Sequence, residues 1–100
     1  MIKVFISNQR VIPKDDMKKI INILNGTFTD YEIIPAAERK PNKPLVELGE
    51  NIKLLQMADV YVRNENDYSS DAVIEDYIVK LYKIEVIQVM VREGAYSTWG

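Results

Sequence analysis

Four short apolar segments, separated by stretches with helical periodicity, are the feature that most constrains the fold of this chain. Residues 2–6, 31–34, 60–62 and 84–91 are rich in Val, Ile, Phe and Tyr, a composition typical of β-strands. The first and last segments are nearly continuous apolar runs, which suits strands buried on both faces of a parallel sheet. The pattern therefore predicts four strands.

Three stretches between these strands repeat apolar residues at the spacing of a helix face. The first follows Pro13 and is expected to end at Gly26, and the second follows a proline-containing loop at residues 36–44. The third is expected to begin where Ser69 or Ser70 serves as the N-cap. The residues expected to face the core are Met17, Ile20, Ile21 and Leu24 in the first helix, Leu45, Leu48, Ile52, Leu55 and Met57 in the second, and Ile74, Tyr77, Ile78 and Leu81 in the third.

The alternation of strands and helices predicts a parallel sheet with helices on both faces and right-handed connections. We expect a single α/β domain over residues 1–100, with a tail at 92–100 that contains Tyr96 and Trp99. The domain should be a small doubly wound one of the flavodoxin or Rossmann type, with four parallel strands in the order 2-1-3-4 and three helices. Ligands of such sheets bind at the carboxyl ends of the strands beside the switch point, here between the first and third strands.

Composition excludes several classes of function. The chain has no cysteine and no histidine, so thiolate and Ser–His chemistry are impossible and the commonest ligands of transition metals are missing. We therefore expect neither a metal site nor a cofactor. The net charge of -2 disfavours nucleic acid as a partner. No apolar run is long enough to span a membrane, and the first strand begins at the amino terminus, so the expected location is the cytoplasm.

Polar residues follow the first and third strands, where the topology predicts a crevice. Ser7, Gln9 and Arg10 follow the first strand and Asn64 follows the third. The side chains after the first strand could bind a sugar hydroxyl or a phosphate, although a loop after a strand is polar in any case. The first loop contains no glycine, which argues against a phosphate-binding loop of the dinucleotide or P-loop kind.

Three acids are candidates for chemistry. Asp71 and Glu75 share a face near the start of the third helix. An ionised carboxylate there could act as a nucleophile at a sugar carbon, or both acids could simply stabilise the helix dipole. Asp59 opens the third strand and could equally be a structural cap. Tyr61 is expected to pack in the core with a solvated hydroxyl.

These residues together resemble the nucleoside 2-deoxyribosyltransferase-like family, and especially its small members in phages and bacteria. The similar segments are Lys3-Val4-Phe5-Ile6-Ser7, Lys43-Pro44-Leu45 with Leu48-Gly49, Ala58-Asp59-Val60, Ile74-Glu75 and Tyr82-Lys83-Ile84. The resemblance implies that Glu75 attacks the anomeric carbon of a nucleoside or nucleotide and that Asp59 shapes the site or assists the departing base. It implies exchange or hydrolysis of the base through a covalent glycosyl-enzyme, and a homo-oligomer. Around the acids, the residues that we expect to bind substrate are Ser7, Gln9, Arg10, Asn64 and Asp71.

The chain also departs from the pattern of that family. Asp71-Ala72 stands where family members usually have glycine and a small polar residue, and Gln9 is followed by Arg10 rather than by proline. These departures support an alternative in which the fold is kept without turnover. The chain would then be a phage or mobile-element accessory protein that binds a nucleotide-like ligand or inhibits a host protein.

Overall fold

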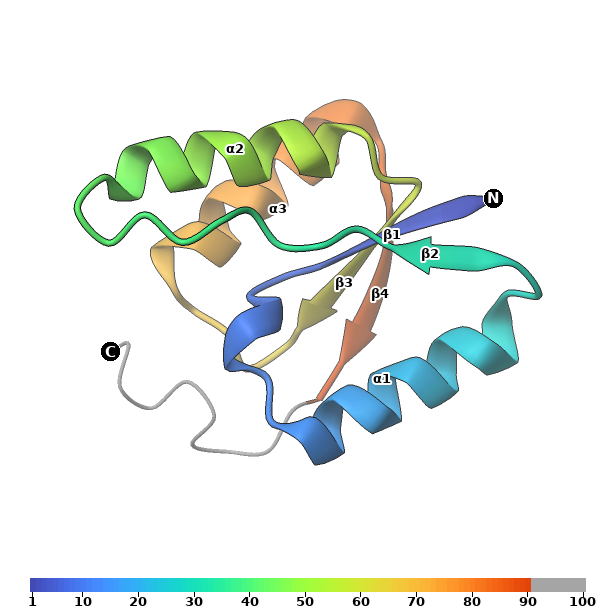
Figure 1. Ribbon diagram of the computed structural model, residues 1–100. Helices are drawn as coiled ribbons and strands as arrows, with labels where there is room; N and C mark the ends of the chain where they lie inside the picture. The colour runs from blue at the N-terminus through green and yellow to red at the C-terminus, as the bar shows by residue number, and fades with distance from the viewer. Residues whose placement is uncertain (91–100) are drawn as a thin grey trace.

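The apolar strand residues build the parallel sheet that the sequence predicts. The computed structural model describes residues 1–90 and contains β1 (Ile2–Ile6), β2 (Tyr31–Ile33), β3 (Val60–Asn64) and β4 (Glu85–Val89) in the order β2-β1-β3-β4. All three strand pairs are parallel, with Val4 aligned to Ile33 on one side and to Val60 on the other. The predicted fold class is confirmed (Figure 1).

The helices cover the two faces of the sheet unequally. Residues 1–90 contain α1 (Lys14–Thr27), α2 (Pro44–Gln56) and α3 (Ser70–Tyr82), besides a 3-10 turn, η1 (Gln9–Val11). The chain steps one way across the sheet from β1 to β2 and the other way from β2 to β3 and β4. Right-handed connections therefore place α1 on one face and both α2 and α3 on the other (Figure 1).

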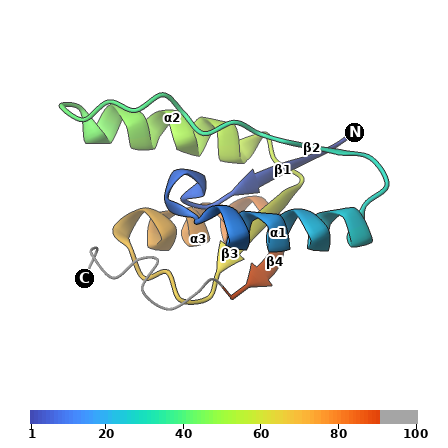
Figure 2. The same cartoon turned by 60° about the horizontal axis from the view of Figure 1, so that its bottom comes forward.

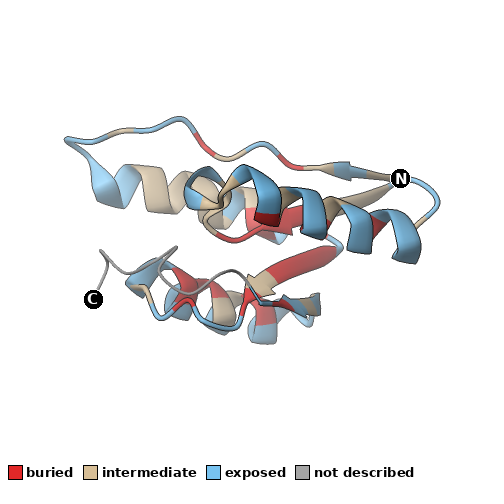
Figure 3. Ribbon diagram, turned by 90° about the horizontal axis from the view of Figure 1, so that it is seen from below, coloured by how far each residue is buried: buried red, intermediate tan, exposed pale blue. Residues whose placement is uncertain are grey.

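Alternation along the central strands divides the core into two layers. Val4 and Ile6 of β1 pack with Ile20 and Leu24 of α1, whereas Phe5 of the same strand faces α2 and α3. Buried residues lie along the central strands and on the inner sides of the helices (Figure 3). The second layer contains Phe5, Ile34, Leu55, Ala58, Tyr61 and Val79.

Several predicted boundaries shift by one or two residues. Helix α1 continues through Gly26, β2 ends at Ile33, and β3 extends to Asn64 because its pairing with β4 continues there. Strand β4 covers five residues rather than the predicted 84–91, and four of the five are not fully buried because it lies at an edge of the sheet. Val91 and the tail with Tyr96 and Trp99 lie outside the described residues.

The predicted core face of α3 is mostly wrong, since of its four residues only Ile78 packs against the second core layer. Ile74, Tyr77 and Leu81 are exposed, and the helix instead buries Ala72, Glu75 and Val79 against the sheet. A helix that is apolar on more than one side does not reveal from its sequence which side packs. In α2, Leu55 is buried as predicted. Leu45 and Met57, at the two ends of the predicted apolar stripe, are exposed.

No helix within residues 1–90 has the length and apolar composition needed to cross a membrane.

Candidate functional site

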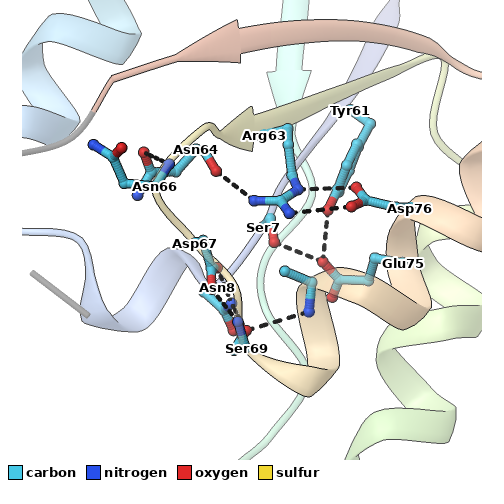
Figure 4. Close-up of polar contacts among 11 residues, drawn as sticks. Ser7, Asn8, Tyr61, Arg63, Asn64, Asn66, Asp67, Ser69, Glu75 and Asp76 are labelled. Atoms are coloured by element: carbon cyan, nitrogen blue, oxygen red, sulfur yellow. Dashed lines mark hydrogen bonds and ion pairs between the residues drawn. The ribbon is translucent and has the colours of Figure 1, made fainter. Parts of the chain in front are cut away.

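The loops after β1 and β3 meet at the carboxyl edge of the sheet, at the predicted switch point. Asn8 adopts the left-handed conformation, with φ of 50°, which asparagine tolerates better than most residues. Its Nδ2 donates to Oδ2 of Asp67 at 2.5 Å and to Oγ of Ser69 at 3.2 Å (Figure 4). Asp67 is fully buried and its Oδ1 accepts from the backbone N–H of Ser69 at 2.9 Å. One asparagine side chain therefore ties the two loops together.

Helix α3 begins at the end of this joined loop and positions Glu75. Ser69 is the N-cap, as predicted, and its Oγ accepts from the backbone N–H of Ala72 at 3.3 Å. Glu75 is only 3% exposed because its side chain points toward the sheet. Its Oε1 accepts from the Ser7 hydroxyl at 2.6 Å and from the Tyr61 hydroxyl at 3.0 Å (Figure 4). Residues from β3, α3 and the end of β1 thus form one hydrogen-bonded group.

Burial dominates the electrostatics of this group. Desolvation raises the pKa of Glu75 to about 7, although the hydrogen bonds from Ser7 and Tyr61 oppose that rise. Burial and the charge of Glu75 raise the pKa of Tyr61 well above its usual range, so its phenol remains a neutral donor. A carboxyl with a pKa near 7 exists in both protonation states at neutral pH.

A cavity of about 460 Å³ lies beside Glu75. Phe5, Ile6 and Val11 form part of its apolar wall, while Gln9, Arg10 and Asp71 are among its polar lining residues. Both hydrogen bonds that reach Glu75 from residues 1–90 end on Oε1. The second oxygen, Oε2, is therefore the one left for a molecule in the cavity.

The segment between β2 and α2 forms another wall of the cavity and is held in place at Ala37. The Arg10 guanidinium donates to the carbonyl of Ala37, and the backbone N–H of Ala37 donates to Oδ1 of Asn51 at 3.1 Å. The backbone N–H of Lys40 donates to Oε1 of Glu47 at 2.6 Å. Figure 2 shows the segment running back alongside α2, so this wall is fixed to that helix.

The structure brings five of the seven predicted site residues together. Glu75, Gln9, Arg10 and Asp71 line the cavity, and the Ser7 hydroxyl donates a hydrogen bond to Glu75. The placement of these residues agrees with the crevice expected from strand order.

Asp59 lies outside the crevice and away from Glu75, so the geometry does not support its predicted catalytic role. It precedes β3, and its Oδ2 accepts from the backbone N–H of Lys3 at 2.8 Å at the amino end of β1. The crevice lies at the other end of the five-residue strand β3, roughly 16 Å away at 3.3 Å per residue. Asp59 is an exposed structural cap, which was the other interpretation of its position.

Besides Asp59, Asn64 is a predicted site residue that lies outside the cavity lining. It is 2% exposed, and its Oδ1 accepts from the backbone N–H of Asn66 at 3.2 Å, which shapes the turn after β3. It is not among the residues that line the cavity. A residue at the carboxyl end of a strand can point into the loop rather than toward the ligand, and the sequence does not distinguish these directions.

Tyr61, Asn8 and Asp67 are the site residues that the sequence interpretation missed. Tyr61 was expected to have a solvated hydroxyl, but it is fully buried and its hydroxyl reaches Glu75. A buried tyrosine usually has a hydrogen-bond partner, so its place between two apolar strand residues could have indicated a nearby polar group.

A second acid of α3 anchors the helix next to the site. The carboxylate of Asp76 accepts hydrogen bonds from Nε of Arg63 at 2.9 Å and from Nη2 of Arg63 at 3.1 Å. The two side chains form a bidentate ion pair between α3 and β3. Such pairs fix orientation as well as adding energy. This ion pair therefore holds α3 against β3 at the residue next to Glu75.

Residues 1–90 contain no group of three acidic side chains arranged to hold a metal ion. No family model, curated protein or solved structure matches this chain. What the site can do must therefore follow from the residues that form it.

Proposed function

We propose that this protein cleaves or transfers the N-glycosidic bond of a nucleoside or nucleotide, with Glu75 as the nucleophile. The observation that supports this function is the buried Glu75 carboxyl at the cavity, with one oxygen held by two hydroxyls. An acid that served only the helix dipole would have no reason to be 3% exposed, since burial of a carboxylate is costly. A positioned carboxylate beside a cavity suits attack on a sugar carbon.

The reaction has two steps at the anomeric carbon. An electron pair of Glu75 Oε2 forms a bond to that carbon, the carbon–nitrogen bond breaks, and its electron pair leaves with the base, which takes up a proton. Water or a second base then attacks the same carbon and releases the Glu75 carboxylate, so the configuration is retained. Ser7 and Tyr61 hold Oε1 throughout and fix the direction of Oε2.

Asp71 is the residue that we assign to protonate the departing base. It lines the same cavity as Glu75, and partial burial together with the negative charges of Glu47 and Asp67 raises its pKa. A raised pKa increases the protonated fraction near neutral pH, which a general acid requires. This role replaces the one that the family resemblance implied for Asp59.

The cavity suits a ligand of this size and chemistry. A volume of about 460 Å³ lies within the range of small-molecule sites. Its apolar wall suits the face of a base, and Arg10 and Arg39 suit the phosphate of a nucleotide. The buried amide oxygen of Gln9 has no hydrogen-bond partner within residues 1–90, which leaves it for a donor on the ligand.

The alternative function is binding without turnover, as in an accessory protein that sequesters a nucleotide-like ligand or inhibits a host protein. The pKa of about 7 for Glu75 favours it, because a neutral carboxyl is a poor nucleophile. The cavity would then hold a nucleoside or nucleotide whose glycosidic bond stays intact.

The test is incubation with a panel of nucleosides and nucleotides, followed by chromatography for free base. We expect base release by the wild-type protein and by Asp59→Asn, which changes a carboxylate at the opposite edge of the sheet. Glu75→Gln, which keeps an acceptor for Ser7 and Tyr61, should abolish release. Equal turnover in Glu75→Gln would overturn the assignment of the nucleophile. Binding detected by calorimetry with no base released from any substrate would support the alternative.

A further inference from the structure

The outer edge of β4 is a feature separate from the Glu75 cavity. Strand β4 ends the order β2-β1-β3-β4 (Figure 1), so no strand within residues 1–90 pairs with its outer side. Residues 86–89 of this strand are uncharged, whereas exposed edges usually carry charges or proline that prevent pairing with another chain. The edge of β4 is therefore able to accept a further strand.

The backbone groups that face outward belong to Val86 and Gln88. The backbone N–H of Glu65, directly after β3, donates to the carbonyl of Val89 at 2.9 Å, so the peptide groups of Val89 face β3. Successive residues of a parallel strand direct their N–H and C=O groups to alternate sides. Val86 and Gln88 therefore direct theirs away from β3, and each offers one N–H and one C=O to an added strand.

A groove of about 580 Å³ runs between this edge and α3. Val79 of α3 and Val86 of β4 form its apolar part, and Val86 is 42% exposed. Lys80 and Glu65 are exposed charged residues of the same groove. Because side chains alternate between the two faces of a strand, every second residue of an added strand would point into this groove.

The two exposed charges of the groove lie at opposite ends of β4. Glu65 bonds to the carbonyl of Val89, so it lies at the carboxyl end of the strand. Lys80 lies in the last turn of α3, directly before the turn that leads into β4, so it lies near the amino end. Arg63 and Asp76, which also line the groove, neutralise each other in an ion pair. The groove is therefore negative at one end and positive at the other.

The spacing of these charges matches alternate residues of a strand. Arg63 is aligned with Gln88, and Glu65 lies two residues further along the chain, about 7 Å away. Lys80 lies one helical turn after Asp76, the partner of Arg63, about 6 Å in the other direction. The two charges are thus about 13 Å apart along the groove, close to the length of four strand residues.

We propose that this groove binds an extended segment of another protein, which adds to the sheet antiparallel to β4. The three residues of the segment that face the groove are basic, apolar and acidic in chain order, with one residue between each. The basic residue meets Glu65, the apolar residue lies on Val79 and Val86, and the acidic residue meets Lys80. Antiparallel pairing is the more stable kind per residue. This inference is independent of the proposed reaction.

This mode of recognition divides its work between backbone and side chains. Hydrogen bonds to the sheet edge supply affinity, and the sites for alternate side chains supply specificity. A second copy of β4 lacks the required charges, because on the face toward α3 it would present Val86 and Gln88. The charges of the groove therefore select a different chain as the occupant.

The first test is fluorescence anisotropy of the whole chain with two labelled nine-residue peptides of identical composition. Each peptide has a central valine, with lysine and glutamate two residues to either side and threonine or serine elsewhere, and the two differ only in the order of the charges. The lysine-first peptide should bind about tenfold more tightly, because the other order replaces two surface ion pairs with like-charge contacts. Equal Kd values, or no binding of either peptide, would overturn the proposal. Tighter binding of the glutamate-first peptide would show that the segment runs parallel to β4 instead.

The double variant Glu65→Lys with Lys80→Glu reverses the charges of the groove. Both side chains are exposed, so the variant should fold as the wild type does. It should prefer the glutamate-first peptide by about the same tenfold factor. An unchanged preference for the lysine-first peptide would mean that the peptides bind elsewhere on the protein.

Gln88→Pro and Gln88→Ala are a matched pair that tests the backbone contacts. Both remove the same side chain, but only proline removes the N–H that points away from β3, a position at which edge strands tolerate proline. Gln88→Ala should bind the lysine-first peptide like the wild type, and Gln88→Pro about tenfold more weakly, with circular dichroism unchanged in both. The same Kd in the two variants would contradict pairing at this edge. If Gln88→Pro does not fold, the charge reversal decides the proposal.

Discussion

The Ser7 hydroxyl donates a 2.6 Å hydrogen bond to Oε1 of Glu75, although the two residues are 68 positions apart in the chain. Ser7 directly follows β1 and Glu75 lies on α3, so the contact exists only because β1 and β3 are neighbours in the sheet. Tyr61 of β3 completes the group by donating to the same oxygen. The site is therefore built by the crossover that places β3 beside β1.

The first prediction concerns stability and pH. Because burial raises the pKa of Glu75 from 4.5 to about 7, the folded protein keeps a proton that the unfolded chain loses between these values. The contribution of Glu75 to the free energy of unfolding should therefore fall as pH rises through this window, by up to about 3 kcal/mol. Denaturant unfolding at pH 5 and pH 8 measures it.

Glu75→Gln isolates this contribution, since its amide does not titrate. The variant should be nearly as stable as the wild type at pH 5 and more stable at pH 8, by about 1–3 kcal/mol. Asp59→Asn is the control and should leave the difference between the two pH values unchanged. A wild-type protein whose advantage over Glu75→Gln grows with pH would contradict the raised pKa.

The second prediction concerns the pH dependence of base release. If ionised Glu75 is the nucleophile, kcat/KM should fall about tenfold per pH unit below an apparent pKa near 7. The hydrogen bond from Ser7 lowers the pKa of Glu75. Ser7→Ala should therefore shift the fall of kcat/KM on the acidic side of the pH profile to higher pH. Tyr61→Phe should do the same while keeping the stacked contact with Phe5, at 6.1 Å between ring centroids. An apparent pKa of kcat/KM that is unchanged in both variants would show that a group other than Glu75 controls the fall at low pH.

The third prediction concerns the tie between the two loops. Asn8→Gly and Asn8→Ala both remove the side-chain donor to Asp67 and Ser69. Because the buried Asp67 carboxylate loses a hydrogen bond, the free energy of unfolding should fall by about 1–3 kcal/mol. Alanine should cost about 1 kcal/mol more than glycine because Asn8 has a φ of 50°. Thermal and denaturant unfolding of both variants check it. Equal stabilities would indicate that the loop relaxes out of the left-handed conformation.

The fourth prediction separates Asp71 from Asp59. Asp71→Asn should lower the rate of base release by about a hundredfold, the contribution typical of a general acid, while Asp59→Asn should leave it unchanged. A substrate with a nitrophenolate leaving group needs no protonation, so its hydrolysis should be nearly insensitive to Asp71→Asn. Equal losses for both kinds of substrate would mean that Asp71 positions the substrate rather than supplying a proton.

Much of the fold could be predicted because its signals are local. Each strand is an apolar run of a few residues, and each helix begins and ends with residues whose preferences act within one turn, such as the N-cap Ser69. The alternation of these elements then restricts the sheet to parallel strands joined by right-handed crossovers. Strand order and the position of the crevice follow from these rules, and the structure agrees with them.

Other features depended on packing that no local pattern encodes. Apolar residues recur on more than one side of α3, so its sequence allows either Tyr77 or Glu75 to face the sheet, and only the tertiary structure buries Glu75 and exposes Tyr77. The hydroxyls of Ser7 and Tyr61 make this burial possible, because they supply hydrogen bonds that water would otherwise provide. The sequence by itself determined the sheet, its order and the presence of an acid at its carboxyl edge. Only the tertiary structure decided that this acid is buried with a raised pKa, since desolvation depends on every element that surrounds it.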